Sequence, residues 1–173
     1  MSTRPQVTLR RARSDDVDFL AGLTSHAEID PFLAAGRDRG ADAIAADIAR
    51  SDAEPGEFGV FVIEADGERV GTMRFALANR RSRIADLRQL ALHPDARGRG
   101  IAHEAARMLQ RHLIRELGFH RLQLEVYAFN ERALVHAERV GFRREGVRRL
   151  AYRHGDGWVD GVLFGLVVED LED

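Results

Sequence analysis

A short run of glycines and arginines offers the clearest chemistry in this sequence. Residues 97–102 read Arg-Gly-Arg-Gly-Ile-Ala and connect an apolar segment, residues 87–92, to a long amphipathic one. Glycines let backbone N–H groups converge without obstruction by a Cβ atom. The first amides of a helix have no partner within the helix and lie at the positive end of its dipole. A strand-to-helix turn of this kind is suited to binding an anion, above all a phosphate.

Two well-known phosphate-binding loops are excluded at this turn. The sequence has no Gly-x-Gly-x-x-Gly here, so the dinucleotide fingerprint is missing, and no Gly-Lys-Ser/Thr, so the Walker loop is missing too. A plain strand-to-helix connection with two permissive residues is the structural alternative. The identity of the anion must come from the rest of the chain.

The composition is that of one globular domain, and it excludes several kinds of chemistry. The 173 residues are 45% hydrophobic and 31% charged with a net charge of −2. These values predict a single domain over residues 1–173, with no nucleic-acid or membrane partner. Because the chain has no cysteine and no lysine, a thiol nucleophile, a disulfide and a Schiff base are excluded, and a cytoplasmic location is expected. The seven histidines show no metal-ligand spacing, so no metal site is expected.

Hydrophobic periodicity predicts the elements that must position the turn. Strands are expected over residues 6–13, 58–65, 69–78, 84–92, 121–129, 147–153 and 158–168, and helices over residues 14–23, 41–50, 101–117 and 130–140. Asp66-Gly67 is a hairpin signal, Gly118 is suited to end the long helix, and Asn130 has N-cap chemistry. The order predicts a mixed α/β (α+β) fold, in which helices cover both faces of a largely antiparallel sheet of about seven strands.

Several motifs in the second half of the chain together resemble the GNAT superfamily of acyl-CoA-dependent N-acyltransferases. Residues 97–102 are similar to the family's Q/R-x-x-G-x-G/A loop, and the strand from Asp86 to Leu92 precedes them. The family's N-x-x-A/S…G-F…E-G segment resembles Asn130-Glu131-Arg132-Ala133, Val140-Gly141-Phe142 and Glu145-Gly146. The closing Gly157-Trp158-Val159-Asp160 resembles the branch that acetylates ribosomal-protein N-termini. The motifs occur in order over roughly the C-terminal half to two thirds of the chain.

The resemblance implies that the anion is the pyrophosphate of coenzyme A. The phosphates would be held by the amides of Arg97, Gly98, Arg99, Gly100, Ile101 and Ala102, with added charge from the two arginines. The pantetheine arm would lie like an extra strand along Leu90, Ala91 and Leu92, and an N–H near Leu92 would face the oxyanion. Asn130 would cap its helix and bond the pantetheine or a water near the thioester. Solvated arginines and plain core leucines are the structural alternatives.

The resemblance also implies the reaction, which is acetyl transfer from acetyl-CoA to a primary amine by direct attack in a ternary complex. A free alkylamine has a pKa of roughly 10, so it must lose a proton before it attacks. Asp86 is the candidate base, because it occupies the place where some family members carry a glutamate on the strand leading to the thioester. Since aspartate is the shorter side chain, a water relay is expected. An exposed, salt-bridged aspartate is the alternative.

The proton donor is where the sequence departs from the family pattern. Many members have a tyrosine seven residues after the asparagine, and this chain has Ala137 there. His136 is adjacent but points about 100° away around the helix. Tyr127 and Tyr152 are other candidate donors, for which a structural role is the alternative. The departure motivates a second hypothesis, a non-catalytic acyl-CoA-binding or sensing domain, and a third, a structural protein whose turn holds no ligand.

The acceptor is expected to be a peptide or a small-molecule amine. It should approach from the side formed by residues 14–50 and the closing hairpin. Acidic residues in these elements would favour a cationic acceptor, although solvated faces explain them equally well. They are Glu28, Asp30, Asp38, Asp42, Asp47 and Asp160. A homodimer is compatible with the implied fold.

Overall fold

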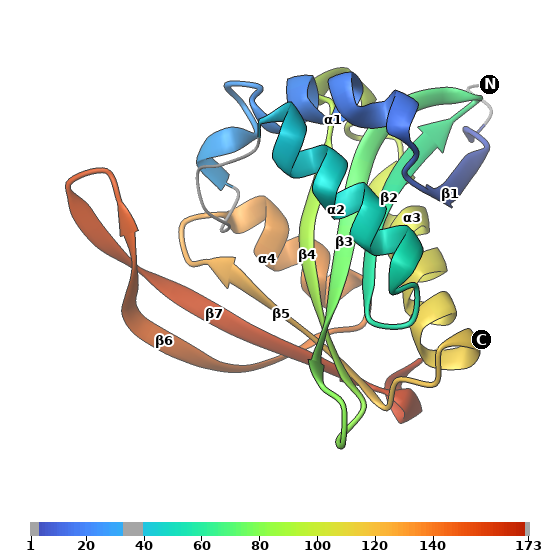
Figure 1. The fold of residues 1–173 in the computed structure, drawn as a ribbon. Helices are drawn as coiled ribbons and strands as arrows, with labels where there is room; N and C mark the ends of the chain where they lie inside the picture. Colours follow the sequence, from blue (N-terminus) through green and yellow to red (C-terminus); the bar gives the residue numbers. More distant parts are fainter. Residues whose placement is uncertain (1–3, 33–39, 172–173) are drawn as a thin grey trace.

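One seven-stranded sheet is the centre of the computed structural model, which describes residues 4–32 and 40–171 (Figure 1). The strands are β1 Val7–Arg11, β2 Phe58–Ala65, β3 Glu68–Asn79, β4 Ile84–Leu92, β5 Arg121–Tyr127, β6 Arg143–His154 and β7 Gly157–Val167. They lie in the order β1-β2-β3-β4-β5-β7-β6, and every neighbouring pair is antiparallel except β4 and β5. The predicted mixed, largely antiparallel sheet is therefore confirmed.

Helices cover both faces of this sheet, as the sequence predicted. They are α1 Val17–Thr24, α2 Ala41–Ala53, α3 Ile101–Arg111 and α4 Glu131–Arg139. Alternate side chains of β2 enter two separate cores, because successive residues of a strand point to opposite faces. Val60 and Val62 pack with α1 and α2, whereas Phe61 and Ile63 pack with α3. In the described part of the chain, no helix is long and apolar enough to cross a membrane.

Several element boundaries differ from the prediction, and three of these differences have a clear physical cause. The helix expected to reach residue 117 changes at His112 into a π-helical turn, in which the Leu117 N–H donates to the His112 carbonyl at 3.0 Å. β5 ends at Tyr127, because the Asn130 N–H closes a turn onto the Tyr127 carbonyl. β6 begins at Arg143, four residues earlier than expected. Its first residues are charged and lie on an edge strand, where hydrophobic alternation is not needed.

The sheet is split where its two parallel strands meet. β4 and β5 pair only over Ile84–Asp86 and Arg121–Gln123, and beyond these residues the strands diverge. Beyond the split, β4 carries a bulge, in which Gln89 has a φ of +55° and Gln89 and Leu90 lie opposite the single residue Met73 of β3. A bulge bends its strand and frees a backbone group from the ladder. The result is a V-shaped opening between β4 and β5.

A buried ion-pair network holds β1 to the start of the first helical segment. Asp16 is fully buried, and its carboxylate accepts hydrogen bonds from the Arg10 guanidinium at 2.7 Å and from the Arg13 N–H at 2.8 Å. Arg69 of β3 is a third donor, at 3.2 Å. Burial alone would raise the pKa of Asp16, but these donors outweigh it and lower the pKa to about 2.

Replacing this carboxylate by an amide, Asp16→Asn, is expected to lower the free energy of unfolding at pH 7 by about 3 kcal/mol. A depressed pKa stabilises the fold at pH values above the unfolded-state pKa, and this stabilisation is lost as the pH falls from about 4 towards 2. Urea unfolding of both proteins at pH 7, 4 and 3 checks this, with the exposed Asp15→Asn as control. A difference that stays constant down to pH 3 would contradict the pKa assignment.

Candidate active site

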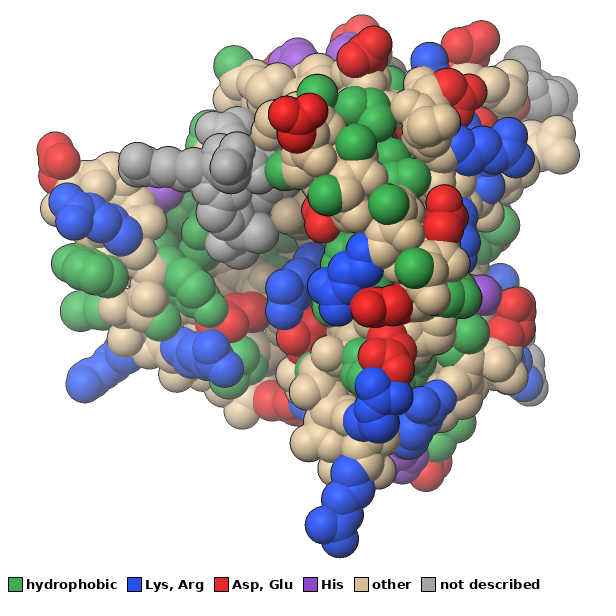
Figure 2. Space-filling model, in the orientation of Figure 1, with side chains coloured by type: hydrophobic (Ala, Val, Ile, Leu, Met, Phe, Trp, Pro, Cys, Tyr) green, Lys and Arg blue, Asp and Glu red, His purple; other side chains and the backbone are tan. Residues whose placement is uncertain are grey.

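A cavity of about 660 Å³ occupies the opening between β4 and β5. Its walls come from these strands and from α4, β6 and β7. Figure 2 shows this side of the molecule hollowed between the projecting β6–β7 hairpin and the helices, with basic and acidic side chains gathered in the hollow. The volume is in the range of small-molecule sites.

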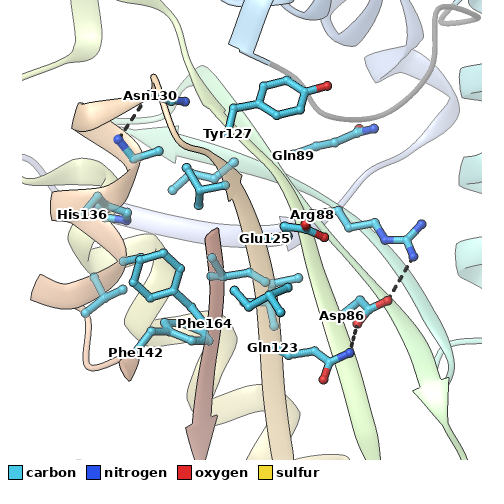
Figure 3. Close-up of a pocket in the computed structure, with 18 of the residues that line it drawn as sticks. Asp86, Arg88, Gln89, Gln123, Glu125, Tyr127, Asn130, His136, Phe142 and Phe164 are labelled. Carbon is cyan, nitrogen blue, oxygen red and sulfur yellow. Dashed lines mark hydrogen bonds and ion pairs between the residues drawn. The ribbon is translucent and has the colours of Figure 1, made fainter. Parts of the chain in front are cut away.

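The two walls of the cavity differ in polarity because β5 alternates. Leu124 and Val126 join the apolar core on the side of α4, together with Ala137. On the opposite face of β5, Glu125 and Tyr127 line the cavity with polar groups (Figure 3). The cavity therefore joins an apolar side, suited to a largely uncharged chain, to a polar side, suited to a charged molecule.

Asp86, the predicted base, lines the polar side at the closed end of the opening. Its Oδ1 accepts a hydrogen bond from the Gln123 amide at 2.7 Å, and its Oδ2 accepts one from the Arg88 guanidinium at 3.0 Å (Figure 3). The side chain is 26% exposed. Both oxygens already have partners. Asp86 therefore lies at the cavity, as a base would, and is also paired with an arginine, as the alternative for this residue stated.

A second carboxylate on the polar side was missed in the sequence analysis. Glu125 accepts a hydrogen bond at Oε2 from the Tyr152 hydroxyl at 2.6 Å, and its Oε1 has no hydrogen-bond partner. Burial and the bond to Glu125 raise the pKa of Tyr152. The signal was available in the alternation Gln123-Leu124-Glu125-Val126-Tyr127, which places every second polar side chain on one face.

The predicted phosphate turn has the expected backbone. Gly98 and Gly100 have φ values of +75° and +78°, and Gly100 is the N-cap of α3 with no side chain capping it. The first intrahelical bond runs from the Glu104 N–H to the Gly100 carbonyl, at 3.1 Å. The amides of residues 101–103 therefore have no acceptor inside the helix. No atom would lie within 4 Å of a Cβ at either glycine, so the turn is open to a ligand.

The two arginines of the turn are engaged with acidic residues. Arg97 lies 3.4 Å from Glu28, and Arg99 lies 3.4 Å from Asp66. Arg99 is the more exposed side chain, at 48%. Any charge that they lend to a bound phosphate is therefore partly offset by these carboxylates, and the open amides of the turn are the stronger feature.

The predicted cofactor residues are not all at the cavity. Leu90 and Asn130 line it, Ala91 and Leu92 are buried, and residues 97–102 are not among its lining residues. The side-chain Oδ1 of Asn130 accepts a hydrogen bond from the Ala133 N–H at 3.2 Å, which confirms its N-cap chemistry (Figure 3). The bulge lies at Gln89 and Leu90, before Leu92, and both of its residues line the cavity.

Three buried polar atoms without hydrogen-bond partners belong to residues that line this cavity. They are Gln89 Oε1, Glu125 Oε1 and His136 Nε2. Such atoms are costly, because burial removes water without supplying a partner. Their gathering at one cavity fits a site that binds a polar ligand. In the described residues, no group of three or more His, Asp or Glu could hold a metal ion.

The acidic residues expected to attract a cationic acceptor are mostly committed to local contacts. Glu28 and Asp47 pair with Arg97 and Arg74, and Asp160 accepts a hydrogen bond from the Leu150 N–H at 2.7 Å. Asp38 lies outside the described residues. The carboxylates that line the cavity are instead Asp86, Glu125 and Glu145, and Glu145 is paired with Arg121.

The split sheet, the bulged β4 and the open turn before α3 define an acyl-CoA-dependent transferase fold. The family model described as "Acetyltransferase (GNAT) domain" matches residues 6–143. The chain therefore belongs to the GNAT acetyltransferase family, the family that its motifs resemble.

Individual relatives agree with this assignment. The chain is 30% identical over 120 residues to the SPbeta prophage-derived uncharacterized N-acetyltransferase YokL of Bacillus subtilis, covering 69% of this chain and 67% of that protein. It spans about half the length of other curated relatives that it matches.

Solved structures show the same fold. They include spermidine N-acetyltransferase from Vibrio cholerae in complex with CoA and spermine (TM-score 0.86, 20% identity, 96% of this chain and 98% of that one). Ribosomal-protein-S5-alanine acetyltransferase from Vibrio fischeri is also similar (TM-score 0.82, 15% identity, 96% of each chain).

His136 on the apolar wall is expected to make the stability of the fold depend on pH. Burial, followed by repulsion from His103 and Arg139, lowers its pKa to about 4. Between pH 6.5 and 4 the imidazole is therefore protonated in the unfolded chain but neutral in the folded one. The free energy of unfolding falls by up to about 3 kcal/mol as the pH falls through this range. His136→Gln is expected to remove this dependence in denaturant titrations from pH 7 to 4. The exposed His120→Gln is the control, and an unchanged dependence in His136→Gln would contradict the assignment.

Proposed function

We propose that this chain transfers the acetyl group of acetyl-CoA to a primary amine, by direct attack within a ternary complex. The observation that carries the proposal is the connection of β4 to the open turn. β4 supplies the bulged wall of the cavity, and the chain continues from it through residues 93–100 to the unpartnered amides at the start of α3. Family membership and relatives named as N-acetyltransferases support it. None of these relatives is described as a binding or sensing domain, so the non-catalytic hypothesis has no support of its own.

The cofactor is assigned to the turn and to the apolar side of the cavity. The amides of residues 98–102 hold the pyrophosphate, and the dipole of α3 adds to their attraction. The Arg97 N–H, which was expected to join them, donates to the Pro94 carbonyl at 3.1 Å. The pantetheine arm lies along Leu90 and Leu92 and reaches Asn130. Acetyl-CoA supplies the thioester, whose carbonyl oxygen is placed at the free backbone group of the β4 bulge, where developing negative charge is stabilised.

The chemistry is assigned to the polar side. The ammonium loses one proton, and its nitrogen then forms a bond with the thioester carbon. As the carbon–sulfur bond breaks and CoA leaves as a thiolate, the nitrogen gives up a second proton to solvent water or to the departing thiolate. Asp86 accepts the amine proton through a water, because its own oxygens are bonded to Gln123 and Arg88. Ala137 removes the usual tyrosine donor, and a thiolate with a pKa of about 8.5 leaves without obligatory protonation.

The acceptor remains open between a peptide N-terminus and a small amine. Fold neighbours include enzymes named for each, a ribosomal-protein acetyltransferase and a spermidine acetyltransferase. The homodimer and the cytoplasmic location expected from the sequence stay predictions.

The function is tested by following free thiol released from acetyl-CoA with spermidine, other small amines and short peptides as acceptors. We expect release that depends on one acceptor class, together with CoA binding by titration calorimetry. Tight CoA binding without turnover on a broad panel would favour the sensing domain. No CoA binding at all would overturn the assignment of the turn.

Gly100 should control cofactor affinity. Its φ of +78° is strained for any other residue, while space for a Cβ is available, so the cost comes from the backbone alone. Gly100→Ala is expected to raise the KM for acetyl-CoA by about tenfold, since a strain of about 1–2 kcal/mol shifts the turn away from its open conformation. Gly56→Ala is the control, because Gly56 has equal space and no positive φ. Equal effects of the two changes would refute the role of the turn.

Asp86 should control turnover. Asp86→Asn keeps the size of the side chain but removes the proton acceptor, so kcat is expected to fall by about 100-fold while the KM for acetyl-CoA stays unchanged. The exposed Asp52→Asn provides the matched control. A kcat within threefold of wild type, at saturating acceptor, would exclude Asp86 as the base.

A further inference from the structure

A carboxylate and several aromatic rings lie together on the polar side of the cavity, apart from the phosphate turn and from the partners of Asp86. Glu125 of β5 lines the cavity, as do Phe32, Tyr127 and Tyr152. The three rings come from the η2 turn Asp30–Phe32, from β5 and from β6, so distant parts of the chain meet here. Figure 3 shows Glu125 and Tyr127 on the same strand beside the bulge of β4.

The Glu125 carboxylate occupies space that is free because residue 161 is a glycine. A Cβ at Gly161 of β7 would lie 2.1 Å from Glu125 Oε1 and 2.7 Å from the Tyr152 ring. The absent side chain therefore lets β7 accept the carboxylate and the ring together. Tyr152 fixes the carboxylate with a 2.6 Å hydrogen bond to Oε2. This arrangement holds a charged group in a defined place.

The carboxylate is held but incompletely satisfied. A carboxylate offers about four acceptor sites, yet Oε1 has no partner and Oε2 has one short hydrogen bond. Oε1 is buried against Gly161, and exchange of the two equivalent oxygens would leave the other one in the same place. A donor from outside the chain therefore reaches the carboxylate at Oε2, where Tyr152 and Arg148 already lie.

The Arg148 side chain places a cation beside the Glu125 carboxylate. The Arg148 guanidinium is 3.5 Å from Oε2, on a side chain that is 59% exposed. A pair this long and this exposed is weak, because water screens it. Among the described residues, the other charged groups near it are tied to each other, Arg88 with Asp86 and Arg121 with Glu145. Arg148 therefore marks a position for a positive charge and can move into solvent when another cation arrives.

The aromatic rings extend this preference for a cation. Tyr127 meets Tyr152 edge to face at 5.4 Å and stacks on Phe129 at 5.4 Å, and Phe129 contacts Phe32 at 5.8 Å. Phe32 and Phe129 are exposed, at 44% and 37%. Ring faces attract ammonium groups, and exposed rings beside a carboxylate provide an entrance for them.

We propose that Glu125 and this aromatic wall bind the acceptor in its cationic form, so that the chain selects a primary alkylammonium. The inference rests on the proposed acetyl transfer and assigns its acceptor site. An alkylammonium carries three N–H donors: one meets Glu125 in place of Arg148, and another remains for the water that leads to Asp86. A polyamine and a peptide N-terminus both present this group, so the two sources must be compared directly.

The experiment measures kinetics with two acceptors, spermidine and an alanine-initiated tetrapeptide, at saturating acetyl-CoA. Glu125→Gln keeps the shape and removes the charge, and it is expected to raise the acceptor KM at least about tenfold with little change in the KM for acetyl-CoA. Arg148→Gln removes the competing cation and is expected to lower the acceptor KM. Glu138→Gln, the same change at an exposed site of α4, is the control. The acceptor that wild type prefers identifies the source of the alkylammonium.

Direct binding separates this site from the reaction. Calorimetric titration of the CoA-saturated protein with butylammonium and with 1-butanol compares a cation with a neutral molecule of similar shape. We expect wild type to prefer butylammonium and Glu125→Gln to lose the preference while it binds CoA normally. Gly161→Ala, which displaces the carboxylate, should act in the same direction.

The outcomes distinguish the two proposals. Turnover by wild type with an unchanged acceptor KM in Glu125→Gln would overturn the acceptor site and leave the transferase intact. Absence of turnover with every acceptor would contradict the proposed function, and the butylammonium titration would then decide the cation site alone. Equal binding of butylammonium and 1-butanol by wild type would refute it.

Discussion

The three-residue limit of the β4–β5 pairing is the constraint on which the site depends. Parallel pairing along the whole strands would fill the cavity with a continuous ladder of hydrogen bonds. The bulge at Gln89 and Leu90 bends β4 away from β5 while its pairing with β3 continues on either side. The ladder between β3 and β4 is therefore interrupted beside the opening at this one bulge, and pairing resumes at Thr72 and Ala91.

The same alternation of side chains that builds the cores also divides the cavity. On β5 the even positions face α4 and the odd positions face β6 and Asp86. One strand thus separates a region suited to a long, largely apolar chain from a region suited to a charged group. The proposed direct transfer would use this geometry, because the amine could then reach the thioester without crossing the apolar side.

Local patterns in the sequence were sufficient for most of the fold and for the glycine-rich turn before α3. The limits of β2 and β4 and the Asp66-Gly67 hairpin agree with the prediction, because alternation, apolar runs and turn chemistry are encoded by neighbouring residues. The π-helical turn at His112 and the early start of β6 were missed, since both depend on packing and pairing between distant segments. The roles of Asp86 and the cofactor residues remain predictions, although the structure gathers several of them at one cavity.

Long-range pairing also explains why Glu125 was overlooked. Its environment depends on Tyr152 and on the missing side chain of Gly161, which are remote in sequence. The acidic residues chosen from the sequence were grouped by their elements, but several of them pair with nearby arginines or backbone groups. Counting charges on an element does not reveal which of them still lacks a partner.

Gly71 lies outside the cavity, but its backbone contact with β4 limits which substitutions the wall of the cavity tolerates. A Cβ there would lie 2.5 Å from the Ala91 carbonyl oxygen and 2.6 Å from a methyl group of Leu92. Any larger residue would push β3 and β4 apart beside the bulge. Residues that line the cavity can vary to suit a new acceptor, whereas Gly71 is expected to be fixed across such changes of specificity. The room for functional divergence in this fold is thus bounded by backbone contact behind the site.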